Sequence, residues 1–235
     1  MTKDAGHDEF MNSFTPHIKE RIAKTWMYIT QPQDGMDFDT SVVPEAMEDK
    51  LAIMKVQAMK KYIPDPNSKI LQVGAGDGLE TKLFMDVGFK NITGLTVGKG
   101  NIKRAKELYG IDLHYQDMHF TKFPTGSFDA VVGFQVIEHS AAPIIAMLEF
   151  SRLFKPHGKV ILDVPSHDHW TLMDNNPHHL LVLTEKQGVS LLVKAGFSDA
   201  FALPGENIGL LFIGTKDVPN SCEDHYKHLA DGELF

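Results

Sequence analysis

The stretch "ILQVGAGDGLET", residues 70–81, decides how this chain folds. An apolar run leads into three glycines at alternate positions, Gly74, Gly76 and Gly78, and then into residues that suit the start of a helix. Small residues between a strand and a helix let backbone N–H groups approach a ligand, and the helix N-terminus adds a partial positive charge. The stretch therefore predicts a strand, a ligand-binding loop and a helix.

Strands and helices alternate along the chain from this point. Continuous apolar strands that alternate with helices indicate a parallel sheet covered on both faces. Strands are expected at 69–73, 91–95, 112–115, 128–134, 159–163, 201–203 and 209–214. Helices are expected at 79–87, 100–109, 141–154 and 184–195. The short connection "PGEN" between the last two strands predicts an antiparallel hairpin, so the expected fold is a doubly wound α/β sheet with a reversed strand near its end.

Residues 1–68 follow a different pattern, because their apolar residues recur at helical spacing. They are interpreted as an N-terminal helical extension or lid, whose methionines and aromatic residues suit a small, uncharged or mildly polar molecule. Ordinary helix packing is the other interpretation of the same residues. Residues 69–216 form the predicted main domain, and residues 217–235 form a C-terminal tail.

Charge and composition exclude some classes of function. The chain has 235 residues, a formal net charge of −8 and a single cysteine. The negative charge argues against non-specific binding to nucleic acid or to anionic membranes, and one cysteine cannot form an internal disulfide. The first residues lack the apolar core of a secretion signal, and no apolar run has the length of a membrane span. We expect a cytoplasmic protein that binds neither nucleic acid nor membrane, and a homo-oligomer stays open.

Segments beyond the glycine loop decide which ligand it holds, because such loops serve dinucleotides as well as S-adenosylmethionine. "YQDMHF" (115–120) follows the third strand and places Asp117 to accept a hydrogen bond from an adenine amino group. "SFDAVVGFQVIEHSAAP" (127–143) and "RLFKPHGKVILDVPS" (152–166) follow in order. With these segments, residues 69–214 resemble the class I S-adenosylmethionine-dependent methyltransferases of small molecules and glycans, with a partial resemblance to the ubiquinone-pathway O-methyltransferases.

The resemblance implies a fold, an activity and a set of cofactor contacts. The fold would be a mostly parallel, seven-stranded Rossmann-like sheet with its last strand antiparallel. The activity would be transfer of a methyl group from S-adenosylmethionine to a small-molecule acceptor, with a hydroxyl favoured. The implied cofactor contacts are Gln72, Gly74, Ala75, Gly76, Gly78, Thr96, Asp117, Met118 and Phe134.

Two positions depart from the pattern of the family. An acidic residue is usual at position 72 and at the end of the second strand, where this chain has Gln72 and Thr96. A hydroxyl is a poorer partner for the two ribose hydroxyls than a carboxylate is. Glu80 is interpreted as a favourable charge at a helix start, with compensation for Gln72 as the alternative. Two other functions therefore stay open, a catalytically degenerate partner subunit and an NADP-dependent reductase in which Lys99 would meet the 2′-phosphate.

Histidines supply the candidate catalytic groups. His139 follows the fourth strand, and His167 and His169 follow the fifth, at the sheet edge where ligands bind in doubly wound folds. Imidazole ionises near neutral pH, which suits a base that must take a proton from a hydroxyl. We expect His139 to be this base and His167 or His169 to orient the acceptor.

A metal site is the last candidate. "QVIEH" (135–139) resembles the ExxEH metal-binding motif of ubiquinone-pathway O-methyltransferases and of small-RNA 3′-terminal 2′-O-methyltransferases. Glu138 and His139 match the motif, whereas Gln135 replaces its first glutamate and removes a charged oxygen ligand of the kind that hard divalent cations prefer. A divalent metal is therefore an alternative that the sequence does not favour.

Overall fold

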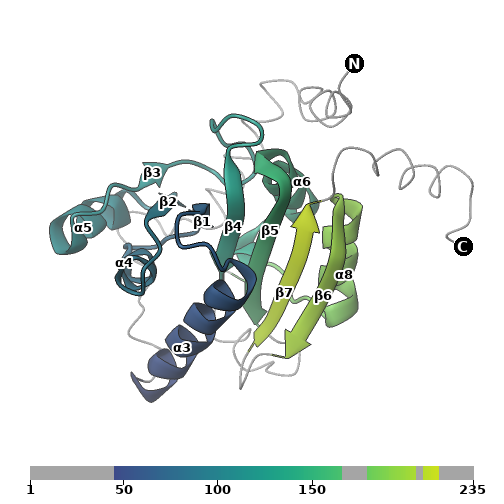
Figure 1. The fold of residues 1–235 in the computed structure, drawn as a ribbon, viewed down its shortest axis with the longest axis horizontal. Coiled ribbons are helices and arrows are strands. Elements are labelled where there is room, and N and C mark those ends of the chain that lie inside the picture. The colour runs from purple at the N-terminus through teal and green to yellow at the C-terminus, as the bar shows by residue number, and fades with distance from the viewer. Residues whose placement is uncertain (1–44, 166–178, 205–208, 217–235) are drawn as a thin grey trace, which may run out of the picture.

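The computed structural model describes residues 45–165, 179–204 and 209–216 (Figure 1). The predicted residues His167 and His169, the tail 217–235 and most of the N-terminal extension lie outside these ranges. The strands are β1 Lys69–Val73, β2 Asn91–Thr96, β3 His114–Tyr115, β4 Phe128–Phe134, β5 Phe154–Pro165, β6 Phe197–Pro204 and β7 Gly209–Lys216. The helices are α3 Glu45–Tyr62, α4 Leu79–Asp86, α5 Lys99–Tyr109, the short 3₁₀ helix η2 Ile137–His139, α6 Pro143–Leu153 and α8 Glu185–Lys194.

One seven-stranded sheet organises the domain, in the order β3-β2-β1-β4-β5-β7-β6. The first five strands pair in parallel, and β7 pairs antiparallel with both β5 and β6. The predicted α/β class, the reversed strand and the final hairpin are confirmed. The carboxyl ends of β1, β2 and β4 therefore meet at one edge of the sheet, which is where ligands bind in doubly wound folds.

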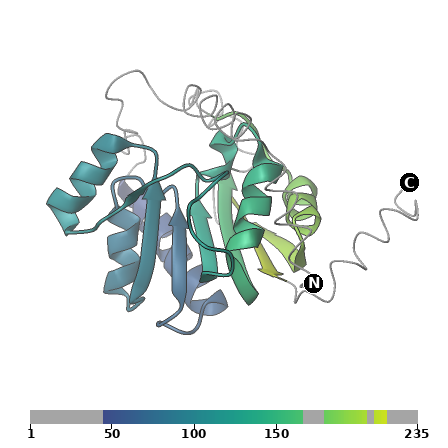
Figure 2. The same cartoon turned by 90° about the horizontal axis from the view of Figure 1, so that it is seen from above.

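Helices cover both faces of the sheet, as Figures 1 and 2 show together. Alternate strand residues point to opposite faces, so that Ile70 packs with α3 and α4 while Leu71 packs with α6 and α8. On the first face Met59 and Phe84 are fully buried, and on the second face Phe150 is fully buried. A smaller cluster joins Ala105 of α5 to the edge of the sheet.

The boundary between α6 and β5 differs from the prediction. Helix α6 starts at Pro143, which suits a first turn because proline has no N–H to leave unpaired, and it ends at Leu153. Residue Phe154 already pairs with Phe128, and an irregularity in the β4–β5 ladder separates this contact from the regular pairing that begins at Lys159. The sequence "FKPHG" carries turn residues, so its pairing depends on the neighbouring strand and could not be predicted from local pattern.

Helix α3 is the described part of the predicted extension, and it packs on the sheet. Ala58, Met59 and Ile63 are buried in the core on that face, which confirms packing as the meaning of these apolar residues. The helix carries Lys55 on the same buried side, where only 8% of the residue is exposed. A buried lysine needs an anionic partner, and its partner lies in the site described below.

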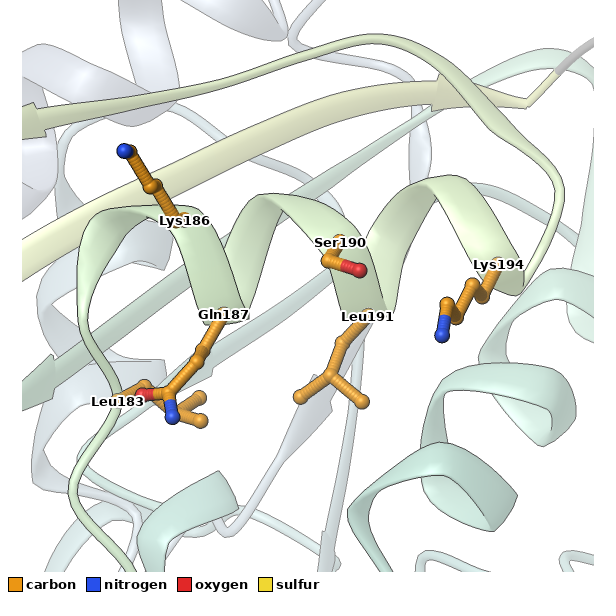
Figure 3. A pocket seen from close by; sticks show the side chains of 6 residues that line it. All are labelled: Leu183, Lys186, Gln187, Ser190, Leu191 and Lys194. Carbon is orange, nitrogen blue, oxygen red and sulfur yellow. The ribbon is translucent and has the colours of Figure 1, made fainter. Parts of the chain in front are cut away.

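Helix α8 carries a surface hollow of about 490 Å³ (Figure 3). Its lining consists of Leu183, Lys186, Gln187, Ser190, Leu191 and Lys194. None of these residues belongs to the predicted cofactor or catalytic set. No helix among the described residues combines the length and the apolar character that crossing a membrane requires.

Candidate functional site

The glycine loop forms the centre of the site. Gly74, Gly76 and Gly78 have φ angles of 68°, 52° and 86°, in the left-handed region that favours glycine. The N–H of Ala75 donates to the carbonyl of Leu95 at 2.9 Å, which ties the loop to β2. A Cβ added at Gly74 would lie 2.5 Å from Cγ2 of Val136, whereas one added at Gly76 would meet nothing within 4 Å. The loop is thus packed on one side and open at Gly76.

Because a Cβ at Gly76 meets no protein atom within 4 Å, a substitution there can test ligand binding separately from protein stability. Gly76→Ala is expected to weaken binding of S-adenosylhomocysteine by at least about tenfold, because the methyl group fills the space through which the backbone must approach the ligand. Gly110→Ala is the matched control, since Gly110 caps α5 at φ 70° and a Cβ there also meets nothing within 4 Å. Both variants carry a similar left-handed strain of about 1 kcal/mol. Thermal unfolding should shift alike for both, and equal calorimetric affinities in the two variants would contradict the loop assignment.

Residues at the ends of β2 and β3 form the side predicted for ribose and adenine. Thr96 ends β2, is 6% exposed, and its Oγ1 accepts a hydrogen bond from the N–H of Gly98 at 3.3 Å. Asp117 accepts from the N–H of His119 at 2.7 Å through Oδ1, while its Oδ2 is buried and has no hydrogen-bond partner within residues 45–165, 179–204 and 209–216. Met118 is fully packed in the core, at 1% exposure. The bare carboxylate oxygen of Asp117 is the atom that an adenine amino group would satisfy.

His119 links this side of the site to the loop after β4. Its ring is completely buried, with Nδ1 2.7 Å from Oδ1 of Asp117 and Nε2 2.7 Å from Oγ of Ser140. The ring therefore fixes the orientation of the Asp117 carboxylate and connects it, through Ser140, to the loop that carries His139. His119 was not predicted as a site residue, although it lies only two residues after Asp117 in the sequence.

Gln72 and Glu80 meet at the entry to the glycine loop. Nε2 of Gln72 donates to Oε2 of Glu80 at 3.2 Å, and Oγ1 of Thr81 donates to Oε1 of Gln72 at 2.6 Å. The other carboxylate oxygen of Glu80 forms an ion pair with the buried Lys55 of α3. Glu80 thus places a carboxylate next to position 72, in addition to its charge at the helix start.

A second cluster joins the turn after β4, which contains η2, to His179 in the segment before α8. Glu138, His139 and His179 place potential ligand atoms within 4.8 Å of one another. The rings of His139 and His179 meet edge to face at a centroid distance of 4.9 Å. Both carboxylate oxygens of Glu138 are buried and find no hydrogen-bond partner among the described residues. Burial, followed by the nearby charge of Asp163, raises the pKa of Glu138 well above its ordinary value. This arrangement can accept a proton or hold a divalent cation.

Asp163, near the end of β5, completes the acidic side of this edge. Its Oδ2 accepts from Nε2 of Gln135 at 2.8 Å, and its backbone carbonyl accepts from the N–H of Gln135 at the same distance. Gln135 has a φ of 52°, which is uncommon for a residue with a side chain and marks the sharp turn out of β4. Burial raises the pKa of Asp163 to about 6, although the hydrogen bond from Gln135 and the charge of Lys55 oppose the shift.

The predicted residues thus fall into two groups. Loop glycines, Thr96, Asp117 and His139 gather at the carboxyl edge of the sheet. The side chain of Phe134 instead packs in the core, 5.6 Å from the ring of Phe84. Asp163 and Lys55 were not predicted, because they lie on a strand and on a helix, and their chemical neighbours are set by tertiary contacts.

Comparisons with known proteins agree with this geometry. Residues 71–162 match the family described as a methyltransferase domain. The chain is 27% identical over 113 residues to the ubiquinone biosynthesis O-methyltransferase of Nitrosococcus oceani, covering 46% of this chain and 48% of that protein. It is 32% identical over 102 residues to the 2-methyl-6-phytyl-1,4-hydroquinone methyltransferase of Synechocystis, covering 41% and 32%. The chain spans about half the length, or less, of these curated relatives.

Solved structures share the fold. The 1,6-didemethyltoxoflavin-N1-methyltransferase of Burkholderia thailandensis, solved with 1,6-didemethyltoxoflavin and S-adenosylhomocysteine, superposes with a TM-score of 0.61 at 16% identity, covering 87% of this chain and 91% of that one. At this identity the likeness concerns the fold alone. The cofactor of the family, S-adenosylmethionine, fits the residues present, because the loop is open at Gly76 and Oδ2 of Asp117 awaits a donor. The fold and the geometry of the site agree with the match of residues 71–162 to the methyltransferase domain family.

Proposed function

We propose that this protein transfers the methyl group of S-adenosylmethionine to a hydroxyl group of a small molecule. The observation that carries the proposal is the cluster of Glu138, His139 and His179. Glu138 and His139 are buried on the loop after β4, whose Val136 packs against Gly74, and the half-buried His179 joins them from the segment before α8. A proton-accepting group beside a methyl donor is what a hydroxyl acceptor requires. The relative named as a ubiquinone biosynthesis O-methyltransferase supports a hydroxyl as the acceptor, and the relative named for a hydroquinone supports quinol-like molecules among the first compounds to test.

The residues of this chain would divide the work as follows. The bound cofactor supplies an activated methyl group on a sulfonium. The glycine loop holds its amino-acid end and Asp117 its adenine, so that alignment is the main contribution of the protein. His139 takes the proton of the acceptor hydroxyl as the oxygen–methyl bond forms and the carbon–sulfur bond breaks. His179, edge to face with His139, holds that ring in place.

Metal assistance is a second candidate, favoured by one observation. Two imidazoles and a carboxylate with ligand atoms within 4.8 Å form a set that divalent metals accept. Glu138 would then be the charged ligand whose buried oxygens are satisfied by the ion. A chelator would abolish transfer in this case and leave it unchanged if His139 acts as the base alone.

The sequence left two other functions open, an NADP-dependent reductase and a catalytically degenerate partner subunit. Lys99 begins α5, and its Nζ lies 5.5 Å from the ring centroid of Tyr115 in a cation–π contact. This is the lysine that would meet the 2′-phosphate of NADP, and it already has a partner in Tyr115. The methyltransferase family match gives this reductase no support. A catalytically degenerate partner subunit would differ from an active methyltransferase by failing to bind S-adenosylhomocysteine.

Calorimetric titration with S-adenosylhomocysteine is the decisive first experiment, with NADP as the comparison ligand and divalent cation present or chelated. We expect micromolar binding of S-adenosylhomocysteine and none of NADP. A screen of catechols, hydroquinones and aliphatic alcohols with labelled S-adenosylmethionine would then identify the acceptor class. Failure to bind S-adenosylhomocysteine under every condition would overturn the proposal and leave the partner-subunit interpretation.

A further inference from the structure

Asp163 occupies a strand position that the pattern of β5 assigns to the core. Ile161, two residues earlier, points to the face covered by α3 and is fully buried there. Because strand residues alternate between faces, Asp163 points to the same face, and it is 1% exposed. A carboxylate buried at an apolar position costs stability unless it is paired. Its Oδ1 has no hydrogen-bond partner in the described part of the chain, so the contacts supplied there leave it incompletely satisfied.

Three carboxyl groups from different elements share one lysine at this place. Lys55 of α3 forms an ion pair with Glu80 and also acts electrostatically on Glu138 and Asp163. Its Nζ lies 5.2 Å from the ring centroid of Phe134, the last residue of β4. We call Glu80, Glu138 and Asp163 the acidic cluster. Lys55 pairs with Glu80, and burial raises the pKa of Glu138 well above its ordinary value, so Asp163, whose pKa is raised to about 6, carries the excess negative charge of the acidic cluster at pH 8.

A second buried glutamate shows that this chain can satisfy such a group when it serves structure alone. Glu149 of α6 is 2% exposed, close to the 1% of Glu138. Its carboxylate accepts from the N–H and the hydroxyl of Thr121 at 2.7 and 2.6 Å and pairs with Arg152 at 2.7 Å. Among the residues that the structure describes, Glu138 has no such partner on either oxygen. The contrast indicates that Glu138 is left for a group that these residues do not supply.

The acidic cluster lies at the entry to the cofactor loop. Glu80 is in the first turn of the helix that follows Gly78, and it accepts a hydrogen bond from Gln72, two residues before Gly74. Asp163 and Glu138 follow at the ends of the neighbouring strands. Any cation bound by the loop therefore interacts favourably with the excess negative charge.

Resting on the proposed function, we propose that the acidic cluster recognises the sulfonium charge of S-adenosylmethionine and thereby discriminates it from the neutral product S-adenosylhomocysteine. When the carbon–sulfur bond breaks, its electron pair stays on sulfur, the sulfonium becomes a neutral thioether, and the acceptor proton leaves to the base. The attraction between cluster and cofactor then disappears. The cluster thus favours exchange of product for fresh cofactor, and Lys55 limits the effect.

The test compares ligand affinities rather than activity. Calorimetry at pH 8 in the presence of a chelator would measure S-adenosylmethionine, S-adenosylhomocysteine and sinefungin, in which a protonated amine replaces the methylated sulfur. In the wild type both cations should bind about tenfold more tightly than the neutral thioether. Asp163→Asn and Glu80→Gln should bring this ratio toward one without weakening S-adenosylhomocysteine, and Lys55→Gln should increase it. Asp86→Asn, an exposed acid at the far end of α4, is the matched control and should leave the ratio unchanged.

Two results would overturn the inference. One is a cation preference that stays the same in wild type and all variants. The other is a parallel loss of all three ligands in the Asp163→Asn and Glu80→Gln variants, which a merely structural role produces. Absence of binding by all three ligands to the wild type would instead overturn the proposed function, and the inference with it. The chelator excludes a bound metal as the source of any difference.

Discussion

Replacing His139 by asparagine is expected to slow methyl transfer to a hydroxyl acceptor by about 10²–10⁴, the range that general-base catalysis contributes. Asparagine keeps a polar group of similar size at a position that is only 8% exposed, but it cannot take up a proton. S-Adenosylhomocysteine should bind this variant as it binds the wild type, because His139 is not part of the cofactor loop. Single-turnover rates with labelled S-adenosylmethionine and the acceptor found by screening measure the effect.

The controls separate a base from a metal ligand. His157→Asn is the matched substitution, since His157 is an exposed residue of β5 and its replacement should leave the rate unchanged. If His139 is the base, a chelator should not matter and His179→Asn should lose less activity than His139→Asn. Equal losses in both histidine variants, together with inactivation of the wild type by the chelator, would favour the metal-assisted candidate. An unaffected rate in His139→Asn would remove this residue from the chemistry altogether.

The fold could be predicted from the sequence because its signals are local. Apolar strands, glycine turns and helix starts each repeat a pattern within a few residues, and a parallel α/β sheet is the arrangement that satisfies all of them. The predicted boundary between α6 and β5 was wrong at Phe154, because the start of a strand depends on its pairing with the neighbouring strand. The short β3, reduced to His114–Tyr115, differs for the same reason.

The candidate site was predictable only where its residues belong to motifs. Asp117 and His139 follow strands in recognisable segments, and they lie where the segments implied. Lys55 and Asp163 belong to no motif, and in the sequence one is a helix lysine and the other an acid before a proline-containing turn. Their meaning comes from tertiary contacts that join residues about a hundred positions apart. The surroundings of Gln72 were equally hard to predict. This position lacks a carboxylate of its own, but Glu80 of the next helix places one beside it.

Asp163→Asn is expected to stabilise the protein at pH 8 by up to about 3 kcal/mol while it removes part of the cofactor preference. Burial raises the pKa of Asp163 from 3.8 to about 6 in the folded state. Between these values the folded state keeps a proton that the unfolded state has lost, so the free energy of unfolding falls as the pH rises through this window. Asparagine carries no such charge at any pH, and its carbonyl oxygen can still accept from Gln135.

Chemical denaturation at pH 4, 5, 6 and 8 would measure the difference. The stabilisation should be full above pH 6 and should vanish near pH 4, where wild-type Asp163 is protonated in the folded state and the charge costs nothing. Asp129→Asn provides a control of opposite sign: burial opposes ionisation there, but hydrogen bonds from Lys155 and from the N–H of Lys69 hold the pKa of Asp129 below its usual value. That variant should therefore lose stability at pH 8. A destabilised Asp163→Asn at pH 8 would mean that pairing with Lys55 outweighs the cost of burial, and the carboxylate would then be a structural ion pair rather than a group kept for the cofactor.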